Sequence, residues 1–260
     1  MTTQNRSKWY YGHNIDSLNY FIDFNEGGSN LSAQLNAGSY SFEEMAVEIA
    51  RAMSEADGAT LTYSCSTNRA NRYFIISSTA NFSILSSTGA HLGTSALPLM
   101  GFTGTDRTGA STYTSNVASG FEYKPQFLLQ EYVDFNDFQQ AAFSNINKSA
   151  SGIVETISFG IEKFMECNIE YATNLDLGNN SEIETNLNGV NELRSFLEYA
   201  TYKRTLEFMP DRDTANNFTK CVLESTAINK DGIGFKLNEL YSRGLANFFE
   251  SGKLTFRRLT

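Results

Sequence analysis

The sequence predicts an α+β fold in which strands dominate, and three observations support this class. Short runs along the chain alternate apolar and polar residues, which is the period of a half-buried strand. Two segments instead repeat apolar residues at three- and four-residue steps, as amphipathic helices do. One such segment falls in each half of the chain, so we expect each half to be a small antiparallel sheet with one packed helix.

The N-terminal half opens with a predicted hairpin followed by a helix. Residues 18–24 alternate apolar and polar side chains, the Gly-rich residues 26–30 turn the chain, and residues 31–35 can return as a partner strand. Ser41 and Glu44 have the spacing of a capping box, in which hydroxyl and carboxylate each accept one unpaired N–H. We therefore expect a helix from Ser41 to about Gly58, where glycine can adopt the left-handed cap.

The remainder of the N-terminal half combines strands with a long segment of low charge. Strands are predicted over residues 60–65 and 72–77, with a short third over 82–85. From residue 86 to 119 Gly, Ser and Thr dominate around an apolar island at 97–102, and Asp106 and Arg107 are the only charged residues. A loop this long is usually functional. We favour an extended contact with a partner over an enzyme lid, because no catalytic residue lies inside it.

A domain boundary is predicted near the middle of the chain. Residues 125–138 are rich in aromatic side chains and indicate an extended connection, and the polar residues 145–152 break the pattern. We therefore expect an N-terminal domain over residues 1–148 and a C-terminal domain over residues 149–260.

The C-terminal half repeats the combination of strands and one helix. Strands are predicted over residues 153–159, 164–172, 205–209, 218–224 and 254–258. A polar loop over residues 174–188 leads into the helix, and a helical turn is expected over residues 236–241. The apolar face of the helix comprises Val190, Leu193, Phe196, Leu197 and Ala200.

The charge balance excludes several classes of function. The chain of 260 residues carries a net charge of −9, and both halves are acidic, so neither offers a basic surface for nucleic-acid phosphates. Charged residues make up only 19% of the sequence. Much of the surface can therefore be desolvated against another protein at a small free-energy cost. This composition favours a component of an assembly over a freely diffusing enzyme.

The sequence predicts neither a membrane span nor a disulfide framework. No run reaches 18 apolar residues, and the first eleven residues lack the pattern of a signal peptide. Cys65, Cys167 and Cys221 are odd in number, widely spaced and placed in strand-like runs. We expect them to be reduced, buried thiols in a protein made in the cytoplasm.

Candidate catalytic and ligand-binding residues are few, and we assign no catalytic, cofactor-binding or metal residue. His13 and His91 have no cysteine, histidine or carboxylate at metal-ligand spacing, so both are expected to be surface or packing residues. Asp211 and Asp213 could hold a divalent cation between their oxygens, but a turn that they close through their own backbone is the favoured interpretation.

Three other patterns are also interpreted structurally. Glu162, Glu166 and Glu170 share one face of the predicted strand, which indicates a solvated or lumen-facing acidic surface. The segment 232–234 begins like a dinucleotide fingerprint but lacks its third glycine, and 251–254 lacks the residues of a phosphate loop. We therefore expect no cofactor and no enzymatic activity.

Residues 153–258 carry a resemblance to a known family. Glu155-Thr156-Ile157-Ser158-Phe159-Gly160 forms a strand, Gly189 to Leu197 a helix with a Leu-x-x-Phe-Leu face, and Leu206 to Asp211 a strand that ends in an acidic turn. This order resembles the tail-tube-like module of tailed-bacteriophage distal tail proteins. The segments from Phe24 to Ala33 and Gly38 to Tyr40 are similar to segments of phage virion proteins.

The resemblance implies an antiparallel β-sandwich with a flanking helix, assembled into a ring that is commonly hexameric. Such a ring surrounds the channel of the tail in the virion and joins tube, hub and baseplate proteins, without a catalytic residue, a cofactor, a membrane or specific nucleic-acid binding. The N-terminal half lies outside this module.

Two other positions and two other classes of function stay open, the less favoured class being a hydrolytic enzyme that uses a carboxylate pair such as Asp211 and Asp213. A neck or tail-terminator ring is compatible with the same features. The aromatic residues Trp9, Tyr10 and Tyr11 suggest the alternative of a receptor- or carbohydrate-binding module at the tail tip.

Overall fold

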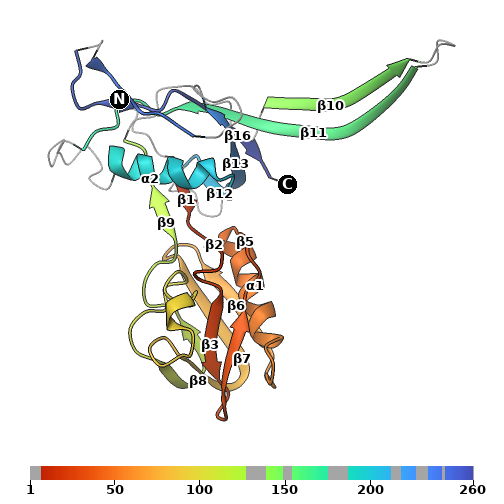
Figure 1. Ribbon diagram of the computed structural model, residues 1–260, viewed down its shortest axis with the longest axis vertical. Helices are drawn as coiled ribbons and strands as arrows, with labels where there is room; N and C mark the ends of the chain where they lie inside the picture. Colours follow the sequence, from red (N-terminus) through yellow and green to blue (C-terminus); the bar gives the residue numbers. More distant parts are fainter. Residues whose placement is uncertain are drawn as a thin grey trace. The chain divides into compact units, whose positions relative to one another are not determined.

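A computed structural model describes the chain as two compact units (Figure 1). The described residues are 7–126, 139–148, 154–174, 187–211, 218–226, 234–241 and 244–259. The N-terminal unit comprises Tyr10–Glu122, and the C-terminal unit comprises the chain up to Trp9 and most of the chain from Tyr123 onward. The division after Glu122 precedes the expected boundary at residue 148, because the strand over residues 139–148 pairs within the C-terminal unit.

The fold is a strand-dominated α+β architecture with antiparallel sheets and β-sandwich character, so the predicted class is confirmed. The N-terminal unit contains a sheet of order β4-β3-β7-β6, with β8 also paired to β7. Its strands are β3 (Phe21–Asn25), β4 (Asn30–Gln34), β6 (Tyr63–Asn68), β7 (Tyr73–Ile84) and β8 (Arg107–Thr114). A second small sheet pairs β2 (Asn14–Ile15) with β5 (Gly38–Ser39).

The predicted hairpin and its neighbouring strands are present, with one difference in length. β3 and β4 pair in the register Phe24↔Leu31 around the Gly-rich turn. The strands predicted over 72–77 and 82–85 are instead one strand, β7, because β8 supplies ladder partners on both sides of an irregularity between Ser77 and Phe82.

Helix α1 (Phe42–Ser54) begins where the capping box predicts. The Ser41 hydroxyl accepts from the Glu44 backbone N–H at 3.3 Å, and the Glu44 carboxylate accepts from the Ser41 backbone N–H at 2.9 Å. These two bonds satisfy donors that the first turn leaves without helical partners. The buried helix face includes Met45, Ile49 and Met53, which join the apolar core of the unit.

The segment from residue 86 to 119 differs from the loop that the sequence predicts. It contains a short 3-10 turn, η1 (Leu92–Thr94), and strand β8. Its apolar island lies in the core of the unit, with Leu97, Met100 and Phe102 fully buried. The alternation of β8 escapes sequence analysis because small Gly, Ser, Thr and Ala residues fill most of its positions.

The C-terminal unit is organised around a seven-stranded sheet of order β10-β11-β16-β13-β12-β1-β9. The strands of this sheet are β1 (Lys8–Tyr11), β9 (Phe121–Tyr123), β10 (Gln139–Lys148), β11 (Val154–Asn168), β12 (Leu206–Met209), β13 (Thr219–Thr226) and β16 (Lys253–Arg258). The division between the units, after Trp9 and after Glu122, falls within β1 and β9. The pairs β10/β11, β11/β16, β16/β13 and β13/β12 are antiparallel. A separate pair joins β14 (Asn238–Glu239) to β15 (Phe249–Glu250).

Three predictions for this unit are corrected. The strands expected over 153–159 and 164–172 form the single strand β11, and the polar break expected over 145–152 begins inside β10. The helical turn expected over 236–241 instead contains strand β14, because Asn238 and Glu239 pair with β15. The remaining strands, β12, β13 and β16, confirm the prediction.

Helix α2 (Val190–Thr201) packs its predicted apolar face into the core of the C-terminal unit. Trp9 lies at the centre of this core and is fully buried. Its ring centroid lies 4.5 Å from those of Phe208 and Phe256 and 5.4 Å from that of Phe196. One aromatic cluster thus joins β1, α2, β12 and β16, and the backbone ladder with β16 holds the long strand β11.

Candidate functional site

The most distinctive feature of the C-terminal unit is a two-stranded arm formed by β10 and β11 (Figure 1). β10 pairs with β11 along its whole length, from Gln139↔Phe164 to Lys148↔Val154. β16 pairs with β11 only from Phe164 to Asn168. Beyond Phe164, β11 therefore leaves the seven-stranded sheet and continues with β10 alone.

Both edges of this arm are open among the described residues. β10 is the terminal strand of the sheet, and β11 from Val154 to Lys163 has no described partner on the side away from β10. An open edge presents a row of backbone N–H and C=O groups that can pair with another strand. A two-stranded ribbon is at best marginally stable by itself in water, so the arm would gain stability from such pairing.

A hollow of about 490 Å³ lies at the base of the arm, where β11 separates from β16. Its lining residues are Ile161, Glu162, Lys163, Arg257, Arg258 and Leu259. The Arg257 guanidinium donates to Glu162 at 3.2 Å and to Glu224 at 2.6 Å, and it lies over the Phe164 ring. These contacts hold β11, β16 and β13 together at the fork, while the Ile161 side chain stays 61% exposed.

The acidic series on β11 is neutralised in part by basic residues of β16. Glu162 pairs with Arg257, and Glu166 pairs with Lys253 at 2.7 Å. Glu170 follows the strand and accepts from the Asn168 amide at 2.7 Å. The strand assignment of Glu162 and Glu166 is therefore confirmed, but their carboxylates are paired across the sheet and do not form an unpaired acidic row.

The N-terminal aromatic residues are structural rather than a ligand platform. Trp9 belongs to the core of the C-terminal unit, as described above. Tyr10 is buried, and the Arg72 guanidinium lies 4.0 Å from the centroid of its ring. Tyr11 packs against Phe121 with ring centroids 5.4 Å apart. A carbohydrate platform built on Trp9 is therefore wrong.

His13 is a buried packing residue of the N-terminal unit. Its imidazole stacks on Phe42 at 5.6 Å and meets the edge of Phe74 at 5.7 Å, and its Nε2 atom lies 3.3 Å from the Ser119 hydroxyl. Burial, reinforced by the positive charge of Arg72, lowers the pKa of His13 to about 3. The imidazole is therefore neutral at physiological pH.

His91 takes part in a polar cluster that the sequence does not reveal. Its Nδ1 atom lies 2.9 Å from the buried carboxylate of Asp23 and 3.2 Å from the Ser32 hydroxyl, and its backbone N–H donates to Asp23 at 2.6 Å. The ring also stacks on Phe21. The cluster attaches the segment after β7 to strands β3 and β4. Asp23 and His91 are 68 positions apart, so no local motif could identify them.

The other candidate residues do not form a metal or nucleotide site among the described parts of the chain. Cys65, Cys167 and Cys221 are free thiols in β6, β11 and β13, as predicted. Burial raises the pKa of Cys65 and Cys167 to about 12 and that of Cys221 well above its usual value, so none is a reactive thiolate. Within the described residues, no group of three His, Cys, Asp or Glu side chains could hold a metal ion.

Several motif residues lie at or beyond the described ranges. Asp211 follows β12, whereas Asp213 lies outside the described residues. Gly234 is described, but the preceding residues of the glycine motif are not. Ser251 is buried, and its hydroxyl donates to the Gly252 carbonyl at 2.8 Å and accepts from the Ile169 N–H at 3.1 Å. These contacts make Ser251 part of the turn before β16 rather than of a phosphate loop.

Comparison with known proteins does not place the chain in a family. No protein-family model and no curated protein sequence matches it. In the described ranges, no helix combines the length and apolar character needed to cross a membrane.

Proposed function

We propose that this chain is a virion structural protein that forms a homo-oligomeric ring of six copies in a bacteriophage tail. The ring would lie in the distal tail or baseplate hub, or next to the tube, and would line the channel and connect neighbouring tail proteins. The observation that carries this proposal is the two-stranded arm with an open edge on each side.

The arm suits a ring because its two edges are different surfaces of the same element. The outer edge of β10 in one copy can add to the open edge of β11 in the next, which is a head-to-tail contact. Head-to-tail contacts generate closed rings when the rotation between copies closes. Closure would pair both open edges of every arm.

The composition supports the same proposal. With only 19% charged residues, the subunit faces can be desolvated at low cost when copies associate. The net charge of −9 suits a channel through which DNA passes without binding, because carboxylates repel phosphates. A ring whose channel surface is neutral or basic would contradict this part of the proposal.

The proposal assigns no catalytic residue, cofactor, metal, membrane contact or specific nucleic-acid site. Its partners are further copies of the chain and other tail proteins such as tube and hub, assembled after synthesis in the cytoplasm of the bacterial host. A neck or tail-terminator ring would use the same arm. A receptor- or carbohydrate-binding module at the tail tip loses its basis in Trp9, which is buried in a core.

The test is the mass of the purified chain by light scattering, followed by negative-stain imaging. The decisive variant replaces residues 142–161 with Asn-Gly, because Ala141 and Glu162 are directly paired and a two-residue turn can close that pair. The matched control replaces Gly27-Gly28 with Asn-Gly in the β3–β4 turn, where Gly27 has φ +91° and asparagine tolerates positive φ.

We expect the intact chain and the control to form rings with a central hole, and the shortened variant to be monomeric. Rings of unchanged size from the shortened variant would show that the arm edges do not hold the ring together. A strict monomer of the intact chain at all concentrations would contradict the ring and favour the binding-module alternative.

A further inference from the structure

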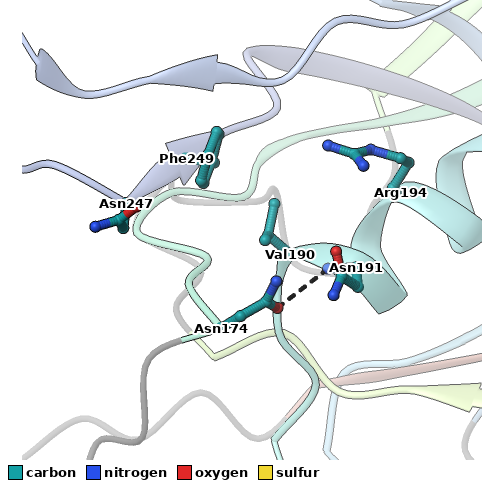
Figure 2. A pocket seen from close by; sticks show the side chains of 6 residues that line it. All are labelled: Asn174, Val190, Asn191, Arg194, Asn247 and Phe249. Atoms are coloured by element: carbon teal, nitrogen blue, oxygen red, sulfur yellow. Dashed lines mark hydrogen bonds between the residues drawn. The ribbon is translucent and has the colours of Figure 1, made fainter.

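A second feature of the C-terminal unit is a small polar pocket beside the first turns of α2 (Figure 2). It has a volume of about 300 Å³ and is lined by Asn174, Val190, Asn191, Arg194, Asn247 and Phe249. Ligand pockets range upward from about 300 Å³, so this pocket can accept one small molecule or one sugar unit of a larger one. It shares no lining residue with the hollow at the base of the arm.

Backbone contacts within the unit hold the pocket walls in place. Ala172 and Phe249 form an antiparallel bridge, with N···O distances of 3.0 and 2.9 Å in the two directions. This bridge sets Phe249 beside the chain that leads to Asn174. The Asn174 side-chain oxygen accepts from the Asn191 backbone N–H at 3.3 Å, as Figure 2 shows. Asn174 thus caps α2, whose own N-cap residue, Gly189, has no side chain.

Gly189 is needed for this arrangement. A Cβ atom at this position would lie 2.5 Å from the Asn174 side-chain oxygen and 2.7 Å from the Thr173 carbonyl oxygen. Both separations are far below van der Waals contact, so any side chain here would displace Asn174 from the pocket wall. Gly189 therefore allows Asn174 to stay at the pocket wall. The four polar lining residues, Asn174, Asn191, Arg194 and Asn247, are solvent-exposed.

Several polar side chains that line the pocket have donors or acceptors that bond to no described residue. Among the described residues, the Arg194 guanidinium and the side-chain amides of Asn191 and Asn247 have no hydrogen-bond or ion-pair partner. Asn174 uses its oxygen for the helix cap and keeps its NH₂ group. In Figure 2, Phe249 and Arg194 stand on either side of the buried Val190.

We infer that this pocket binds a sugar that carries a carboxylate, such as a hexuronic acid. The planar guanidinium of Arg194 can take a carboxylate through two parallel N–H···O bonds. The asparagine amides supply both donors and acceptors, which suits hydroxyl groups that need both. The Phe249 ring offers an apolar wall for the C–H groups of a sugar ring. The residues that line the pocket include the basic Arg194 and no acidic residue, and the Glu239 carboxylate accepts from the backbone N–H of Asn247 at 2.7 Å.

The test compares two ligands that differ only at C6, methyl β-D-glucuronide and methyl β-D-glucoside. Ligand-observed NMR titrations of the full chain should give a Kd at least about tenfold lower for the glucuronide, which is the size expected for a hydrogen-bonded charge pair. Inorganic phosphate is the third probe. It should bind at least about tenfold more weakly than the glucuronide, because it cannot use the amides and the Phe249 wall together.

Three variants test whether the preference for the glucuronide arises in this pocket. Arg194→Gln should remove the preference for the glucuronide, and Phe249→Leu should weaken both sugars while preserving the preference. Arg204→Gln makes the same charge change beyond the other end of α2, where Arg204 lies over Tyr199 and Tyr202, and should leave both affinities unchanged.

Three results would overturn the inference: equal or undetectable binding of the two sugars, phosphate binding as tight as that of the glucuronide, or an unchanged preference in Arg194→Gln. The melting temperature of each variant shows that it is folded. Ring formation is measured separately by mass, so failure of this inference and failure of the proposed assembly are distinguishable.

Discussion

The two longest described strands, β7 in the N-terminal unit and β11 in the C-terminal unit, have opposite surroundings. β7 is 12 residues long and is flanked at Ile76 by Cys65 of β6 on one side and Tyr113 of β8 on the other. β11 is 15 residues long and leaves its sheet beyond Phe164, with β10 as its one described neighbour. The first strand is the interior of a finished sheet, whereas the second offers a place for another strand.

This difference indicates that the N-terminal unit is stabilised by contacts within the chain, whereas the arm is suited to assembly with another copy. The N-terminal unit encloses an apolar core with α1, the sheet and the segment 96–102, so its strands gain stability from contacts within the chain. Among the described residues, the arm beyond Phe164 has no third strand, and a strand from a neighbouring copy would complete it. Stability and assembly should therefore respond differently to equivalent substitutions.

The sharpest comparison places the same residue change in both strands. Ile76→Pro removes a ladder N–H and a fully buried side chain, so we expect it to lower the free energy of unfolding by at least about 4 kcal/mol. Ile157→Pro, in the arm, should lower it by about 1 kcal/mol or less but reduce the ring fraction. Urea denaturation and light scattering measure the two effects.

Ile76→Val and Ile157→Val serve as controls for the change in side chain at the same positions. The former should cost about 1 kcal/mol. If Ile157→Pro destabilised the chain as much as Ile76→Pro while rings persisted, the arm would be part of the folded core and not an assembly element.

Trp9→Ala tests whether the C-terminal unit has a core of its own. Because Trp9 is fully buried against three phenylalanine rings, truncation should cost about 3–5 kcal/mol. Hydrogen exchange followed by mass spectrometry should show faster exchange in α2, β12 and β16, with β6 and β7 unchanged. Equal acceleration in both units would contradict separate cores, and Trp9→Phe should be milder.

His13 makes the N-terminal unit sensitive to pH. Its pKa is about 3 in the folded chain and about 6.5 when unfolded, so the unfolded state binds a proton first as the pH falls. The stabilisation is complete above pH 6.5 and is lost progressively toward pH 3. Between pH 7 and pH 5 the loss should be about 2 kcal/mol.

The measurement is urea denaturation of the wild type and His13→Gln at both pH values. The glutamine variant should lose about 2 kcal/mol less over this interval, since it has no imidazole to protonate. Identical pH dependence in the two proteins would mean that folding does not lower the pKa of His13.

The helix caps should give the smallest effects. Ser41→Ala removes the side-chain oxygen of the α1 capping box and should cost about 1 kcal/mol. Asn174→Ala removes the longer cap contact of α2 at 3.3 Å and should cost about 0.5 kcal/mol. Thermal denaturation of both variants, with the exposed Ser195→Ala as control, ranks them. A larger loss of stability in Asn174→Ala than in Ser41→Ala would show that α2 depends on its cap contact more than α1 depends on its capping box.

Sequence analysis identified the elements with strong local signals. Both helices follow from apolar spacing, and α1 also from Ser41 and Glu44. Alternation or short apolar runs predict β3, β4, β6, β7, β11, β12, β13 and β16, but they do not predict β1, β2, β5, β9, β10 and β15. β8 was missed because its small polar residues carry little pattern, and β14 because two residues are too few for any period to show.

The candidate sites were less accessible from sequence. The polar pocket combines residues from 174 to 249, and the cluster of Asp23, Ser32 and His91 joins two strands to a distant turn. The positions of hydrogen-bonding side chains follow no period along the sequence. Which of them become neighbours in space depends on how the strands pair. The open edges of the arm are likewise a property of pairing, which no single strand reveals.

The sequence by itself determined the class of fold, the two helices, about half of the described strands, the acidic charge and the burial of Cys167 and Cys221, because these depend on local pattern or on composition. Cys65, which was also expected to be buried, is only partly buried. Only the tertiary structure decided that Trp9 is buried in the core of the C-terminal unit and that Leu97 and Phe102 are buried in the core of the N-terminal unit. It also decided that β11 extends beyond its pairing with β16. These facts depend on contacts between residues far apart in the chain. These contacts stabilise the protein only once the sheets have formed, so a pattern within a short stretch of sequence does not reveal them.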